Sequence, residues 1–422
     1  NYHDPLISWY NGVLSQMSGW HIQCENIDHH LSHAYNSFYF SGYNEALIVI
    51  IDGLGNNLDT ESYYIWRDTT IEKIGWNNYM TNGMGIGRAY ESFTNYIWWD
   101  SRSAGKTMWL SSYGSFKWEP WELFFLDKNI SVISNLTQKY EHGVELYLKQ
   151  LGHTELIAEK WTLDSAINLA SYIQYQCEHI VIELISKLVQ RTGIRKLCLW
   201  WWVALNWLIN NKLLSEKIVD EIYIPSSACD TWQCIGNALA WLAQKGIHLQ
   251  EYITLPSYGR IYNQSDILDV LEKKQKKFIL PYITKRANFN YKHITNKTSL
   301  LTQVAKHIWQ WKIVWWFQGG SECGARALWF RSILANPTIS YMKDHINHKV
   351  KHREPFRPFA CSVIESEMPK YFHYTSKKSP FMMFICEVKE QYRKLLSAVT
   401  HVDYTCRIQT VNKEYWLYYK LL

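Results

Sequence analysis

The chain has 422 residues, a mass of 50.1 kDa and a net charge of +6, with 47% apolar and 19% charged residues. This composition is globular and excludes a disordered chain, a collagen or a coiled coil. A single core seldom grows past about 250–300 residues, so we expect two domains.

Two further classes are disfavoured by the distribution of residues. The longest nearly uncharged run covers 197–209, which is shorter than the roughly 20 residues that a membrane span needs. No block of lysine and arginine stands out as a nucleic-acid arm. The nine cysteines are scattered without a CxxC spacing, which favours a reducing, cytoplasmic location over a disulfide scaffold.

The first half of the chain alternates between predicted strands and helices. The segment 29–40 is expected to be a helix, and 45–53 reads as a strand buried on both faces that ends in Asp-Gly. A hairpin over 62–76, a helix over 164–191, and strands over 196–199 and 221–224 follow. This order predicts an α/β domain that covers residues 1–245.

A second domain, residues 256–422, is expected after a linker at 255–259. It begins with an amphipathic helix over 265–274 and contains a dense basic stretch from 312 to 365. The loop 319–326 is rich in glycine and is expected to open a helix, so that its backbone N–H groups would face an anion. Arg326, Arg331 and the segment 351–357 strengthen this prediction of a phosphate site, against the alternative of a solvated surface.

His29 and His33 are four residues apart, so on a helix they share one face and can bind one metal ion. Asp52, at the end of the buried strand, is a candidate third ligand. The alternative is a pair of buried or surface histidines without a metal. Asp230, after the strand at 221–224, could complete the site, or could instead cap the helix expected at 233–244.

Taken together, these segments resemble the nodulation-type O-carbamoyltransferases, the NodU/CmcH family. The matching stretches are HHLSHA (29–34), IVIIDG (48–53), GKTMWLSSYG (105–114), LCLWWWVALN (197–206), IPSSACD (224–230), FQGGSECGARALWFRSILANP (317–337), VKHREPFRPFACSV (350–363) and HVDYTCRIQTV (401–411). The resemblance implies an actin/hexokinase-like, TsaD-like first domain and a YrdC-like second domain, both α/β.

The resemblance also implies a reaction. Family members use carbamoyl phosphate and ATP, form a carbamoyl-adenylate, and carbamoylate a hydroxyl of a small molecule. Carried over by position, the metal ligands are His29, His33, Asp52 and Asp230, with Fe²⁺ as the expected ion. Gly53, Trp201, Trp202 and Asn206 would contact the nucleotide. Arg326, Arg331, Ser332, Lys351 and Arg353 would bind carbamoyl phosphate. Because like charges gather where an anion offsets them, we expect the four basic residues of this set to line one concave pocket of the second domain, separate from the metal.

The same resemblance leaves the catalytic base unassigned. In the family the base lies nearer the amino terminus, in a region that we expect to be absent here, and His3 lies too close to His29 to represent it. Three alternatives therefore stay open. The acceptor could be a macromolecule such as tRNA or a protein, the chain could be an inactive fragment that binds nucleotide or a partner, or it could be a nucleic-acid binder that uses tryptophan and lysine. The acceptor itself has no sequence signature.

Tryptophan is unusually abundant, with 22 residues against 20 glycines. Seven tryptophans stand where the family pattern expects glycine, namely Trp109, Trp201, Trp202, Trp232, Trp311, Trp315 and Trp329. Overpacking costs about 1–3 kcal/mol per site, so seven such replacements should destroy the fold. Because UGA differs from a glycine codon by one base and some bacteria read UGA as glycine, we predict that these positions are glycine in the living protein. The alternative is a decaying pseudoenzyme.

Overall fold

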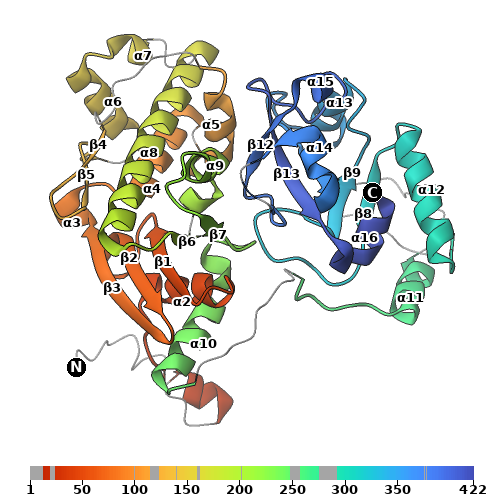
Figure 1. The fold of residues 1–422 in the computed structure, drawn as a ribbon, viewed down its shortest axis with the longest axis horizontal. Helices are drawn as coiled ribbons and strands as arrows, with labels where there is room; N and C mark the ends of the chain where they lie inside the picture. Colours follow the sequence, from red (N-terminus) through yellow and green to blue (C-terminus); the bar gives the residue numbers. More distant parts are fainter. Residues whose placement is uncertain are drawn as a thin grey trace.

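The computed structural model describes residues 13–19, 24–98, 100–114, 123–138, 140–158, 162–200, 202–247, 257–274, 292–374, 376 and 378–422. Figure 1 shows the chain as two adjacent parts, a first part that ends after α10 (Gln233–Gln244) and a second part that begins near α11 (Gln264–Lys274). Both parts combine helices with sheets, so the mixed α/β class is confirmed. The proposed boundaries at 245 and 256 stay a prediction, because residues 248–256 lie outside the described residues.

A five-stranded sheet forms the centre of the first part. It is built from β1 (Glu45–Ile51), β2 (Asp59–Arg67), β3 (Thr70–Asn78), β6 (Lys196–Trp200) and β7 (Glu221–Tyr223), in the order β3-β2-β1-β6-β7. Strand β1 runs antiparallel to β2 and parallel to β6, and β6 runs parallel to β7. All six apolar residues of β1 are fully buried, as the unbroken apolar run predicts. The predicted hairpin is confirmed as the β2–β3 pair.

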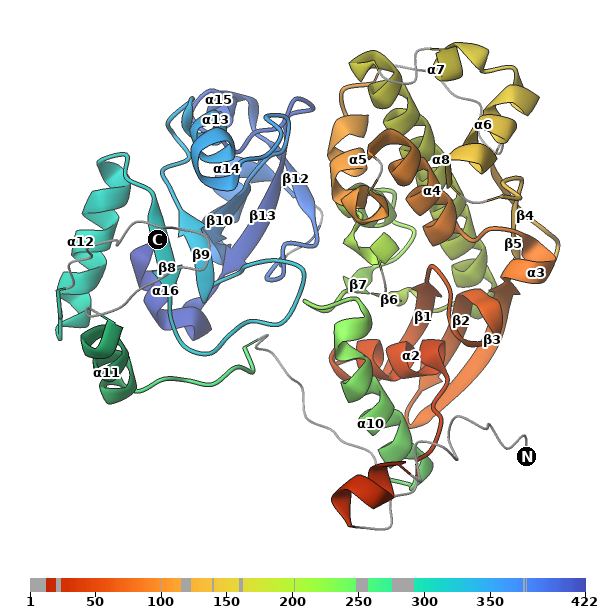
Figure 2. The same ribbon diagram turned by 180° about the vertical axis from the view of Figure 1, so that it is seen from behind.

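Helices surround this sheet, as both views show (Figures 1 and 2). Helix α2 (His29–Tyr39) packs on α10, and Gly236 is required there because a Cβ at this position would collide with the backbone of Ser32. The long helix α8 (Leu163–Thr192) contacts α4 (Ile86–Trp98) and α5 (Ala104–Ser111). It ends at Gly193, whose φ of 74° matches the predicted stop.

Shorter elements complete the described residues of the first part. They are η1 (Asn56–Leu58), α3 (Tyr79–Asn82), η2 (Ser101–Ser103), β4 (Phe124–Leu126), β5 (Val132–Ser134), α6 (Tyr140–Leu151), α7 (Thr154–Ala158), η3 (Trp202–Leu205), α9 (Trp207–Ser215) and η4 (Asp230–Trp232).

The second part is organised around a four-stranded sheet. Its strands β10 (Ala360–Ile364), β11 (Phe372–His373), β12 (Ile385–Val388) and β13 (Thr405–Val411) lie in the order β10-β13-β12-β11. Strands β10 and β13 are parallel, and the other pairs are antiparallel. The remaining helices are α12 (Lys297–Trp309), α13 (Met342–Ile346), η5 (Asn347–Lys351), η6 (Glu365–Glu367), α14 (Met368–Tyr371), α15 (Glu390–Arg393), η7 (Lys413–Tyr415) and α16 (Trp416–Leu421).

One element of the second part differs from its prediction. The glycine-rich loop does not open a helix, because Arg331–Leu334 form strand β9, paired with β8 (Val314–Phe317). The carboxylate of Glu322 accepts the backbone N–H groups of Leu328 and Arg331 and of the two residues between them. These four N–H groups, which follow the loop directly, are therefore satisfied by Glu322 and do not face an external anion.

The two parts touch each other through several backbone and side-chain contacts. Asn210 Nδ2 donates to the carbonyl oxygen of Met383 at 3.1 Å, and Ser226 Oγ donates to that of Cys323 at 3.1 Å. A Cβ at Gly324 would collide with the backbone of Ser226, so the loop approaches the first part closely only because glycine stands there.

Candidate metal and anion site

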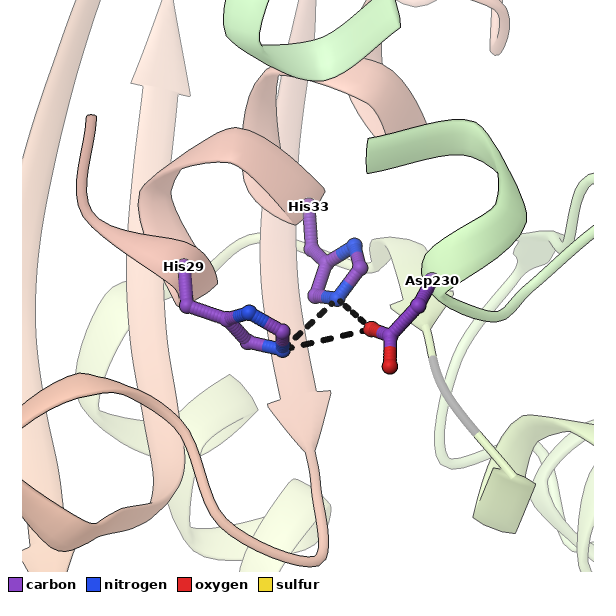
Figure 3. A group of neighbouring side chains, drawn as sticks. All are labelled: His29, His33 and Asp230. Carbon is purple, nitrogen blue, oxygen red and sulfur yellow. Dashed lines mark hydrogen bonds and ion pairs between the residues drawn. The ribbon is translucent and has the colours of Figure 1, made fainter. Parts of the chain in front are cut away.

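The amino-terminal turn of α2 places two imidazoles side by side. Asp28 starts the helix by accepting the N–H of Leu31, and His29 and His33 follow one turn apart on one face. Their Nε2 atoms lie 3.2 Å from each other (Figure 3). His33 is fully buried, whereas the side chain of His29 is 22% exposed. The i, i+4 spacing thus converges as the sequence predicts.

Asp230 reaches the same point from the turn after β7. Its Oδ1 atom lies 3.4 Å from Nε2 of His29 and 3.3 Å from Nε2 of His33 (Figure 3). The three ligand atoms lie within 4.8 Å of one another. The alternative role of Asp230 as a helix cap is not observed, because the residue before α10 is Trp232 and no side chain caps that helix.

Asp52 joins this group from the carboxyl end of β1. Its Oδ2 atom lies 2.9 Å from Nε2 of His29 and 3.3 Å from Nε2 of His30. Asp52 is buried and also accepts the backbone N–H of Gly53. The proposed four-residue site therefore has three ligand atoms that cluster tightly and a fourth that contacts the cluster through His29.

His30 was not among the predicted site residues. It is buried beside Asp52, and its Nδ1 lies 2.7 Å from Oγ of Ser62 on β2. Gly55 lies against the His30 ring, since a Cβ there would come within 2.6 Å of Nε2. In the sequence, only its position next to His29 points to His30 as a site residue. Helical spacing places the two histidines on different faces of the helix, so this pattern did not predict the contact of His30 with Asp52.

The electrostatic environment suits a bound cation. Burial favours the neutral form of Asp52, but its hydrogen bonds with His29 and His30 outweigh burial and hold its pKa well below the usual range. Burial also tends to lower the pKa of His29, and the opposing effect of Asp52 and Asp230 raises it. Burial lowers the pKa of His33. The ionised carboxylate of Asp52 and the neutral imidazole of His33 are donors that a divalent first-row metal accepts, and such an ion would displace the proton that the raised pKa favours on His29.

A cavity of about 1100 Å³ opens beside these residues and extends to the second part. It is lined by Asp52, Gly53, Asn206 and Asp230 of the first part and by Arg326, Ser332, Lys351 and Arg353 of the second part. The predicted separation of the basic pocket from the metal site is wrong, because one cavity reaches Asp52 and Asp230 as well as the basic residues.

Residues proposed for the nucleotide lie in the wall of this cavity where they are described. Asn206 is buried at the start of α9, where its Oδ1 accepts the N–H of Ile209 and its Nδ2 donates to Gln174 of α8 at 2.9 Å. Trp201 lies outside the described residues. Trp202 begins η3, and its side chain is not among those described.

Arg331 is not in the wall of the cavity, which corrects its predicted role. Its guanidinium donates to the carbonyl oxygens of Gln318 and Gly319 and lies over the ring of Phe317. In strand β9, Arg331 pairs with Phe317 of β8. It therefore braces the β8–β9 pair instead of binding the anion.

Arg357 and Arg407 also line the cavity, although neither was among the predicted residues. Arg326 and Arg407 both lie over the ring of Trp207, at 4.5 and 4.6 Å from its centroid. Burial and the mutual repulsion of the two guanidiniums lower the pKa of Arg326, and burial lowers that of Arg407 to about 10. Buried cations without a carboxylate partner are typical of a site for an anionic ligand.

Comparison with known proteins gives the family. Residues 20–239 match the model of the carbamoyltransferase N-terminus, and residues 305–422 match that of the carbamoyltransferase C-terminus. The chain belongs to the carbamoyltransferase family, as its motifs predict.

Named relatives agree with this assignment. The chain is 30% identical to Nodulation protein NolNO of Sinorhizobium fredii over 96% of its length, and 27% identical to Nodulation protein NolO of Bradyrhizobium diazoefficiens over 92%. An uncharacterised Synechocystis protein is 29% identical over 92%. The chain spans 58%, 69% and 66% of these three proteins, respectively.

Proposed function

We propose that this chain carries out O-carbamoylation with carbamoyl phosphate and ATP as co-substrates, through a carbamoyl-adenylate. The observation that supports the proposal is the single cavity, whose wall contains Asp52 and Asp230 of the His/Asp cluster together with the cationic residues of the second part. In the transfer step, the acceptor hydroxyl oxygen bonds to the carbamoyl carbon, the bond from that carbon to AMP breaks, and the hydroxyl proton passes to a base that we leave unassigned.

The residues that the two parts contribute to the cavity have distinct roles in this proposal. Lys351, Arg353 and Arg407 bind the phosphate of carbamoyl phosphate, because clustered cations offset its charge. Gly53, Asn206 and the loop that contains Trp201 and Trp202 approach the nucleotide. A divalent metal, Fe²⁺ in our proposal, held by His29, His33, Asp52 and Asp230 would act as a Lewis acid on a bound oxygen.

The fold of each part is consistent with the same proposal. The order β3-β2-β1-β6-β7, with three antiparallel strands followed by parallel ones, supports an actin/hexokinase-like, TsaD-like first domain. We assign the second part to the YrdC-like type on the family resemblance alone. Among the described helices, none has both the length and the apolar character to cross a membrane. A small-molecule acceptor and a cytoplasmic location are part of the proposal.

Release of AMP from ATP that depends on carbamoyl phosphate tests the function. Arg353→Ala removes a cation from the cavity wall, and we expect it to raise the KM for carbamoyl phosphate by about tenfold or more, since a charge-assisted contact contributes about 1.5–3 kcal/mol. Lys349→Ala is the matched control, because Lys349 belongs to the same segment but is exposed and outside the cavity.

Three outcomes separate the alternatives. Absence of AMP release from the wild-type chain would support the inactive alternative. Equal changes in the KM for carbamoyl phosphate in Arg353→Ala and Lys349→Ala would show that the phosphate of this substrate does not bind at Arg353. AMP release that requires a tRNA or a protein acceptor would favour transfer to a macromolecule.

A further inference from the structure

Three of the cations that line the cavity, Lys351, Arg353 and Arg357, belong to a loop that is folded around a buried asparagine. We call residues 347–359 the basic loop. Asn347 Oδ1 accepts Nε of Arg353 at 2.7 Å, and Asn347 Nδ2 donates to the carbonyl oxygen of Arg357 at 2.9 Å. The loop turns at His352, which has a φ of 48°. Because Asn347 is almost fully buried, these bonds give the basic loop a defined shape.

The basic loop contacts both the cavity and the first part. Lys351, Arg353 and Arg357 line the cavity. Glu354 forms two ion pairs: its Oε1 is 2.8 Å from Nζ of Lys106 on α5, and its Oε2 is 3.6 Å from a guanidinium nitrogen of Arg357 in the same loop. Both side chains of the Lys106–Glu354 ion pair are less than one third exposed. The basic loop therefore both lines the cavity and contacts the first part.

Aromatic contacts reinforce the contact between the parts. The ring of Phe356 stacks on Trp98 with a centroid distance of 6.0 Å and meets Tyr113 edge-on at 6.4 Å. Helix α5 also borders the cavity through Gly105 and Met108, whereas neither Lys106 nor Glu354 is in its wall. The ion pair lies behind the wall, and it joins α5 to the basic loop.

Electrostatics explain why the basic loop needs such a support. Three cations in one short segment repel each other, and burial together with Arg353 and Arg357 lowers the pKa of Lys351. Burial alone would raise the pKa of Glu354, but Lys106 outweighs it and lowers that pKa, so the carboxylate stays ionised at neutral pH. A loop that is fixed before the anion arrives has less conformational entropy to lose on binding.

We infer that the Lys106–Glu354 ion pair is a positioning contact that holds the basic loop against α5, so that contacts made by the first part raise the affinity of the second part for its anionic substrate. The identity of that anion as carbamoyl phosphate rests on the proposed function. Neither residue is catalytic, since both act through the loop.

Two possible roles of Glu354 predict opposite changes in the affinity of the Glu354→Ala variant for carbamoyl phosphate. If Glu354 acted only through its charge, Glu354→Ala would remove a negative charge near the anion and tighten binding. If the ion pair positions the loop, Glu354→Ala and Lys106→Ala both weaken binding, each by about fivefold for a contact of about 1 kcal/mol. The double alanine variant then loses no more than Glu354→Ala alone, because Glu354→Ala already removes the contact with Lys106 together with the contact with Arg357.

Calorimetric titration of the full chain with carbamoyl phosphate makes this test. We expect the charge-reversed variant K106E/E354K to bind more tightly than K106E or E354K alone, because only the double reversal restores the ion pair, whereas repulsion by Arg357 is the same in E354K and in the double variant. Glu387→Ala is the control, because it breaks the 2.8 Å ion pair with Arg393 within the second part and leaves the contact with α5 intact.

Two results would overturn the inference. One is unchanged or tighter binding by Glu354→Ala, and the other is a charge-reversed variant that binds no more tightly than K106E or E354K alone. A wild-type chain that binds no carbamoyl phosphate would contradict the proposed function instead. The ion pair is then tested by heat unfolding, where single variants should lower the melting temperature and charge reversal should raise it above that of K106E or E354K alone. Equal melting temperatures for all variants would refute the contact.

Discussion

Single tryptophans are the residue-scale feature that most needs an explanation. Trp311 follows the last residues of α12 with a φ of 68°, the left-handed conformation that glycine usually supplies after a helix end. Trp311 and Trp315 are 64% and 75% exposed. Trp329 is fully buried, and its indole N–H has no hydrogen-bond partner within the described part of the chain. These three environments are unusual for tryptophan and support the prediction of glycine.

Other tryptophans at expected glycine positions are better accommodated. Trp109 is buried against Trp207 and His401, and Trp232 is buried and donates its indole N–H to Sγ of Cys323. The structure can hold an indole at these two sites.

The codons at the seven positions decide between glycine and tryptophan. We predict UGA at Trp109, Trp201, Trp202, Trp232, Trp311, Trp315 and Trp329 in the gene, and peptides from the native protein with glycine there by mass spectrometry. UGG codons would contradict this prediction and would favour a decaying pseudoenzyme, because the indoles would then be real.

At the scale of elements, the β8–β9 segment depends on one carboxylate. Glu322 accepts backbone N–H groups from four successive residues, 328–331, with distances between 2.8 and 3.2 Å. Ser332, at the cavity, follows directly in β9. A charged acceptor shared by several donors is a strong local constraint, so Glu322 fixes the start of the strand that reaches the cavity.

Replacement of Glu322 measures this constraint. We expect Glu322→Ala to lower the free energy of unfolding of the second part by about 3 kcal/mol, because buried N–H groups lose a charged acceptor. Glu322→Gln should lose less, since one amide oxygen still accepts. Denaturant titration checks both, with the exposed Glu367→Ala as a control within about 0.5 kcal/mol of wild type. An alanine variant as stable as this control would show that the carboxylate is not needed.

At the scale of the whole molecule, most of the central sheet could be predicted from the sequence. The apolar run of β1, the hairpin and the helix that stops at Gly193 are local patterns, and all three are confirmed. The predicted role of Arg331 was wrong because the glycine-rich segment looks like a helix start. In the structure, the carboxylate of Glu322 accepts the backbone N–H of Arg331, which begins a strand instead.

Contacts between distant segments explain what the sequence did not predict about the site. His30 and Arg407 gain their positions from neighbours that are remote in the chain, Ser62 and Trp207 respectively. That one cavity joins both groups also depends on how the two parts meet, which no local motif describes.

The central claim is that one cavity brings together a metal site and a separate anion site. The most direct measurement determines bound Fe²⁺ and carbamoyl phosphate affinity in parallel for His33→Ala and Arg353→Ala. We expect His33→Ala to lose the metal and carbamoyl transfer but to keep the affinity for carbamoyl phosphate, whereas Arg353→Ala should keep the metal and lose about tenfold or more in that affinity. A wild-type chain that binds no divalent metal, or a His33→Ala variant that retains it, would contradict the proposed site.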